Sequence, residues 1–215
     1  MQQESHGNKP SGQSSFTEQA ADAKVSAPSI SSSSVETATT KILNENSDQS
    51  KTMAKSGPDL QNAIIALITK LKSKSETDSR LQAILDRYFI QVDLSEPNAD
   101  NITNLLNSKS FLWGIIKLQA LFTNAEAKNH LSMDSWNKIA NKFDELYSSK
   151  DISLTSYDNV TCWPQSPTNI NFQDDELKKN FEQVFNAKIC VQTAPEKALE
   201  QIKQLTARLD KIKQK

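Results

Sequence analysis

Residues 111–122 read FLWGIIKLQALF, a run that puts apolar side chains on nearly every side of a helix. A helix at the surface of a globular protein shows one apolar stripe, whereas a helix that is apolar all round is buried. We therefore expect residues 111–122 to form a helix that neighbouring elements cover on all sides.

Amphipathic helices are predicted on both sides of this run. The first opens at Ser56-Gly57-Pro58-Asp59, with proline near its first position and a carboxylate in its first turn, and extends to about residue 73. Residues 75–78 can cap a second helix that reaches Val92, and Ser132 can cap another that reaches Tyr147. Short connections favour antiparallel packing of these four helices.

The segment from residue 151 to residue 172 interrupts the helical period. Residues 152–155 alternate, and residues 160–163 and 189–191 resemble short strands, so we expect a small β-hairpin or two-stranded element. Helical order resumes at Asp174. The predicted fold of residues 58–215 is mainly α, a bundle of five to six helices with a small β element.

Residues 1–57 differ in composition from the rest of the chain. They contain 13 Ser, 5 Thr and a single aromatic residue, so they cannot bury enough apolar surface to offset the entropy of ordering. We expect a disordered tail, serving either as a solvated extension or as a recognition or export segment. Its polar, Ser-rich composition is similar to that of substrates of specialised bacterial secretion systems.

The last predicted helix, which opens at Pro195, carries a heptad pattern. Apolar residues recur at alternating steps of four and three, as in a coiled coil. The helix is therefore expected either to dock on its own domain or to pair with a partner chain. The candidate partner-binding residues are Ile202, Leu205, Leu209 and Ile212, together with Trp163 if that loop residue is exposed.

No pattern typical of catalysis, a cofactor or a metal is found. Gly114 is the only glycine after Gly57, which excludes glycine-rich phosphate loops, and His130 is the only histidine after residue 57, which excludes a two-histidine metal site there. Cys162 and Cys190 fit small buried residues. A cysteine enzyme with His130 as base has no support from spacing, and we expect no enzymatic activity.

Bulk properties limit the partner and the compartment. The formal net charge is −1 and the sequence pI about 6.2, which disfavours generic nucleic-acid binding. No apolar run is long enough to cross a bilayer, no Sec signal is seen, and two distant cysteines favour a reducing, cytoplasmic location. In such a location the sequons Asn101-Ile102-Thr103 and Asn159-Val160-Thr161 would be chance matches.

The resulting functional hypothesis is a non-enzymatic protein-interaction module, an adaptor or subunit of a larger assembly, such as one related to bacterial secretion. It would bind a protein partner through the C-terminal helix. The alternative is a bacterial effector with a role in virulence, exported without a Sec signal through its N-terminal tail.

Overall fold

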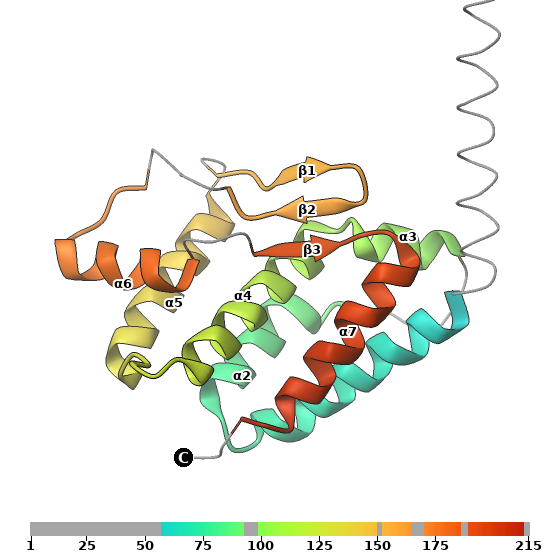
Figure 1. The fold of residues 1–215 in the computed structure, drawn as a ribbon, viewed down its shortest axis with the longest axis horizontal. Coiled ribbons are helices and arrows are strands. Elements are labelled where there is room, and N and C mark those ends of the chain that lie inside the picture. Colours follow the sequence, from blue (N-terminus) through green and yellow to red (C-terminus); the bar gives the residue numbers. More distant parts are fainter. Residues whose placement is uncertain (1–56, 93–98, 150–151, 165–169, 186–188, 213–215) are drawn as a thin grey trace, which may run out of the picture. The chain divides into compact units, whose positions relative to one another are not determined.

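Helix α4 (Lys109–Glu126) lies at the centre of the fold, and most of its side chains are buried (Figure 1). It begins after Ser108, whose side-chain oxygen accepts a hydrogen bond from the Phe111 N–H at 3.2 Å. Elements on several sides contact it, including α2, α3, α6 and β3. The prediction of a helix buried on all sides over residues 111–122 is confirmed.

The computed structural model describes residues 57–92, 99–149, 152–164, 170–185 and 189–212. All of them belong to one compact unit, which spans residues 42–215. The tail expected over residues 1–57 lies outside the described residues, Gly57 excepted. Among those described, no helix is both long and apolar enough to cross a membrane.

The helical prediction is confirmed in class and corrected in number. The described residues contain seven helical segments, counting the π-helix η1 (Leu85–Phe89) with α2 (Ser79–Ile84). The additional one is α3 (Ala99–Leu106), where the sequence indicated only one or two turns. The predicted cap of the second helix is Asp78, whose carboxylate accepts from the Arg80 N–H at 3.0 Å.

Helix α7 (Pro195–Leu209) lies beside the helix of residues 57–75, and an ion pair between Lys70 and Asp210 joins them (Figure 1). Proline occupies its first position, as predicted. Its heptad residues point into the domain: Ala198, Ile202, Leu205 and Leu209 are all buried. Of the two alternatives for this helix, the structure shows docking on its own domain.

Helices α5 (Met133–Ser148) and α6 (Asp175–Phe185) complete an aromatic cluster against α4. The ring centres of Trp113 and Phe143 are 4.9 Å apart, and those of Phe143 and Phe185 are 4.8 Å apart. Trp163, from the chain after the second strand, lies 5.5 Å from Trp113 and 5.4 Å from Phe185. Such ring contacts add specific geometry to the burial of large apolar surfaces.

The expected β-hairpin is present, and a third strand extends it to a three-stranded sheet. Strands β1 (Thr155–Tyr157), β2 (Val160–Cys162) and β3 (Cys190–Gln192) form one antiparallel sheet in the order β1-β2-β3. The first two strands form a local hairpin, whereas β3 follows α6 in the sequence. Long-range pairing of this kind leaves no signal in the local sequence pattern.

Cys162 and Cys190 form a disulfide, which corrects the prediction of two unlinked cysteines. They lie directly opposite each other in the register of β2 and β3. The Trp163 N–H donates to the Ile189 carbonyl and the Thr193 N–H donates to the Asn159 carbonyl, so these residue pairs are the hydrogen-bonded ones. The alternation along the strands makes Cys162 and Cys190 a non-hydrogen-bonded pair, where facing residues approach most closely. Linking residues 28 apart stabilises the fold by about 3–4 kcal/mol in the chain-entropy description.

Gly114 allows α4 to approach η1. A Cβ atom built on Gly114 would lie 2.7 Å from Tyr88 Cβ and 2.8 Å from the Phe89 ring, closer than carbon atoms pack. The sequence analysis used this glycine only to exclude a phosphate loop. Its structural role is to bring the two backbones together.

We expect Gly114→Ala to lower the free energy of unfolding by about 1–3 kcal/mol, because the added methyl group overpacks this contact. In an exposed helix the same change would stabilise by about 1 kcal/mol, so the sign of the effect is diagnostic. Urea denaturation of the two proteins measures it. Thr123→Ala, at an exposed position of the same helix, is the control, and a stabilised Gly114→Ala protein would contradict the described contact.

Candidate functional site

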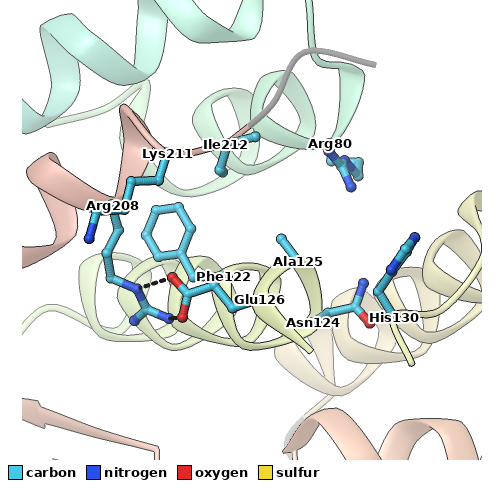
Figure 2. Close-up of a pocket in the computed structure, with 9 residues that line it drawn as sticks. All are labelled: Arg80, Phe122, Asn124, Ala125, Glu126, His130, Arg208, Lys211 and Ile212. Carbon is cyan, nitrogen blue, oxygen red and sulfur yellow. Dashed lines mark hydrogen bonds and ion pairs between the residues drawn. The ribbon is translucent and has the colours of Figure 1, made fainter. Parts of the chain in front are cut away.

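The candidate site is a groove where α4 ends, α2 begins and the chain leaves α7 (Figure 2). It encloses about 350 Å³. Its lining combines three cationic side chains and one histidine with one carboxylate and an apolar floor. The lining residues are Arg80, Phe122, Asn124, Ala125, Glu126, His130, Arg208, Lys211 and Ile212.

Arg208 and Glu126 form one end of the groove (Figure 2). The guanidinium donates to both carboxylate oxygens, with Nε and Nη2 each 3.0 Å from an oxygen, and its carbon lies 4.8 Å above the centre of the Phe122 ring. This forked, stacked geometry is one that arginine can adopt and lysine cannot. The pair joins the last turn of α7 to the last turn of α4.

Arg80 and His130 lie at the other end of the groove in the same view. Arg80 is held by Asp78, with Nε 2.9 Å and Nη2 2.6 Å from the carboxylate oxygens. Burial acts to raise the pKa of Asp78, but the hydrogen bonds and charge of Arg80 outweigh it, so the pKa lies below its ordinary value. Asp78 therefore stays ionised and orients Arg80 while it caps α2.

A second cavity of about 380 Å³ continues from this end and shares Arg80 and His130 with the groove. Residues from the start of α2 and from the connection between α4 and α5 line the rest of it. The two cavities therefore meet at Arg80 and His130.

Lys211 differs from the two arginines of the groove. Its side chain is exposed, and within the described residues no ion pair involves its ammonium group. Arg80 and Arg208 already have carboxylate partners, whereas Lys211 has charge available for an external anion. This makes Lys211 the residue of the groove best suited to recognise an acidic group.

A separate polar network lies inside the domain, around Lys117 of α4. The Lys117 side chain is 2% exposed, and its Nζ lies 2.6 Å from the Asp144 carboxylate, to which the Tyr88 hydroxyl also donates. Burial lowers the pKa of Lys117, and the hydrogen bond and charge of Asp144 act in the opposite direction. Burial first, and then the hydrogen bond to Asp144, raises the pKa of Tyr88.

This network is tightly packed rather than open. The Lys117 ammonium lies 5.4 Å from the centre of the Tyr88 ring and 5.7 Å from that of Phe143. Neither the groove nor the cavity beside it is lined by Lys117, Asp144 or Tyr88. The arrangement suits a structural role, in which a buried charge fixes how α4, η1 and α5 pack. The sequence signal for this network was a lysine inside an otherwise apolar helix, and no prediction was based on it.

The five predicted partner-binding residues are all buried. Trp163 and Ile202 are each 2% exposed, so the condition attached to Trp163, that it be exposed, is not met. Leu205 and Leu209 lie in the same core as Ile202. Of the five, Ile212 alone lines the groove, as part of its floor.

The other residues singled out from the sequence do not assemble into a catalytic site. Cys162 and Cys190 are joined to each other, so neither sulfur is a free nucleophile, which overturns the cysteine-enzyme reading. His130 is exposed and lines both cavities. Across the described ranges, no three His, Cys, Asp or Glu side chains are grouped as metal ligands would be.

We expect Asp144→Ala to lower the free energy of unfolding by about 3–5 kcal/mol, because it leaves the buried Lys117 ammonium without a counter-ion. Lys117→Met should cost much less, since Asp144 is partly exposed and keeps Tyr88 and Arg87 as partners. Urea unfolding of both variants at neutral pH checks the order. A larger loss for Lys117→Met than for Asp144→Ala would contradict this account of the network.

Comparison of the chain with protein-family models, with curated proteins and with solved structures found no match. The functional argument therefore rests on the geometry of the groove, the buried network and the disulfide.

Proposed function

We propose that this chain is a non-enzymatic protein-interaction module, an adaptor or subunit of a larger assembly, and that it contacts its partner through the groove at the end of α7. The observation that carries the proposal is the combination of Lys211, a cation that no carboxylate of the described residues pairs, with an apolar floor between two arginines that carboxylates hold. This is the composition of a site for a segment that carries both acidic and apolar side chains.

The chemistry of the groove indicates how such a segment would bind. An acidic side chain would lie near Lys211 at the open edge, and an apolar side chain would contact the floor of Phe122, Ala125 and Ile212. Because Glu126 and Asp78 hold Arg208 and Arg80 in place, both guanidinium groups are ordered before the partner arrives. Ordering in advance reduces the entropy that binding must offset.

The proposal changes which part of the C-terminal helix makes the contact. Ile202, Leu205 and Leu209 lie in the core, so a partner could reach them only if α7 left its own domain. Charged substitutions at these positions would therefore test folding rather than binding. Arg208 in the last turn of α7, and Lys211 and Ile212 just after it, reach the groove.

We expect Lys211→Glu to weaken partner binding by about tenfold, because the charge reversal acts on an exposed contact and leaves the fold intact. Lys203→Glu is the matched control, since it makes the same change at an exposed position on α7 outside the groove. Both variants and the unchanged chain are compared by quantitative affinity capture from extract of the source cells, at low and at high salt.

The proposal requires a stoichiometric partner that Lys203→Glu retains and Lys211→Glu loses, with capture that weakens as salt rises. A partner captured equally by both variants would overturn the groove as the contact. Circular dichroism of each variant confirms that the fold is unchanged.

The disulfide favours a second candidate, an exported protein such as a bacterial effector. Disulfides persist in oxidising compartments and are rare in the cytosol, where a cytoplasmic adaptor would keep both cysteines reduced. The Cys162–Cys190 pair is therefore an observation that supports export. The two candidates are compatible, because an exported protein can also act by binding a partner.

The redox state of the protein in its source tests the second candidate. Cells are treated with an alkylating reagent before lysis, and mass spectrometry then measures whether Cys162 and Cys190 carry the label. Unlabelled, linked cysteines support export to an oxidising compartment. Complete alkylation without prior reduction would sink this candidate and leave the groove proposal standing.

A further inference from the structure

Asn159 stands at the tip of the hairpin that joins β1 and β2. It begins the sequon Asn159-Val160-Thr161, which fits the acceptor pattern for N-linked glycosylation. The sequence analysis set the sequon aside because two distant cysteines indicated a reducing compartment. The disulfide between Cys162 and Cys190 removes that reason, and it begins one residue after the sequon ends.

The turn presents the Asn159 side chain to solvent. The backbone of Asn159 has a φ of 60°, in the left-handed region that asparagine adopts more readily than most residues, and the residue is exposed. Its carbonyl accepts a hydrogen bond from the Thr193 N–H at 2.9 Å, which anchors the main chain. Within the described residues no hydrogen bond engages its side-chain amide, so the amide nitrogen is available as an acceptor of a sugar.

The third residue of the sequon determines when modification would take place. Thr161 is 4% exposed, and its hydroxyl oxygen lies 3.2 Å from that of Ser156. A transferase that must contact this hydroxyl cannot reach it once β2 is paired on both sides. Transfer therefore has to precede closure of the sheet and formation of the disulfide, both of which take place in the same oxidising compartment.

We propose that Asn159 carries an N-linked glycan, added in the oxidising compartment where the Cys162–Cys190 disulfide forms. The donor is a lipid-linked oligosaccharide diphosphate. The Asn159 amide nitrogen forms a bond to the anomeric carbon of the first sugar and gives up one proton. The bond between that carbon and the diphosphate oxygen breaks, and the lipid diphosphate leaves with the electron pair.

The surroundings of Asn159 suit a bound glycan. Strand β1 is an edge strand whose residues are all exposed, and Tyr157 on it is 67% exposed. An exposed strand edge with a large aromatic side chain favours association with other chains unless something covers it. A glycan two residues from Tyr157 would cover this edge.

The second sequon provides an internal comparison. Asn101 lies in helix α3 rather than in a turn, and it already has an interaction with another group. The fold that forms after transfer must accommodate the glycan, and the exposed turn at Asn159 suits this better than a helix at Asn101, since glycan-bearing asparagines are expected on surface loops. The inference therefore assigns the modification to Asn159 and not to both sequons.

The inference rests on the second candidate function, export to an oxidising compartment, and the experiment separates their failures. The full-length chain is isolated from its source after alkylation of free thiols and digested. The peptides are treated with peptide-N-glycosidase in heavy-oxygen water, and mass spectrometry then reads each sequon. We expect Asn159 to become heavy-oxygen-labelled Asp only after enzyme treatment, and Asn101 to remain Asn.

Sequon variants expressed in the source cells provide the matched controls. Thr161→Val preserves the shape of the buried side chain but abolishes the sequon. The apparent mass of this variant on electrophoresis should therefore fall by that of one glycan. Thr161→Ser retains the sequon and should keep the mobility of the unchanged chain. Linked cysteines with an unmodified Asn159 would overturn the proposed glycan but leave the export candidate standing. Free cysteines with an unmodified Asn159 would overturn both. A glycan on Asn101 alone would overturn the assignment to Asn159.

Discussion

The contact between Gly114 of α4 and Tyr88 and Phe89 of η1 leaves no room for a single additional carbon atom. Because the two backbones approach this closely, the side chains on either side of Gly114 reach past the contact into neighbouring elements. Trp113 contacts the rings of Phe143 and Tyr147 in α5, and Lys117, one turn further along, reaches Asp144. The position of α4 against η1 therefore fixes both the aromatic cluster and the buried charge network.

The aromatic cluster links the helices to the small sheet. Trp163 follows β2 in the chain, and its ring contacts those of Trp113 and Phe185. The disulfide at Cys162, the preceding residue, links β2 to β3. Two short strands would contribute little stability alone, since an isolated two-stranded ribbon is marginal in water. Burial of Trp163 and the covalent link together make a three-residue strand a fixed part of the domain.

The charges of the domain divide into two groups with different roles. Lys117 lies against the Tyr88 and Phe143 rings beside Asp144, and burial lowers its pKa. Arg80, Arg208 and Lys211 surround an open groove instead, where a partner can meet them. The charges of the groove are therefore open to an external group, whereas those of the network act in packing, because solvent access decides which charges an external group can contact.

The sequence by itself determined the helical class of the domain, the buried character of residues 111–122, and several helix starts, among them Asp78, Ser132 and Pro195. These depend on periodicity and capping, which act between residues a few positions apart. Only the tertiary structure decided the pairing of the third strand, the disulfide and the groove. Cys162 meets Cys190, and Arg208 meets Glu126 across 82 positions, through packing that no local pattern encodes. Of the predicted contact residues Ile212 alone reached the groove, because the heptad pattern marks which side of α7 is apolar and cannot tell whether that side meets a partner or the domain's own core.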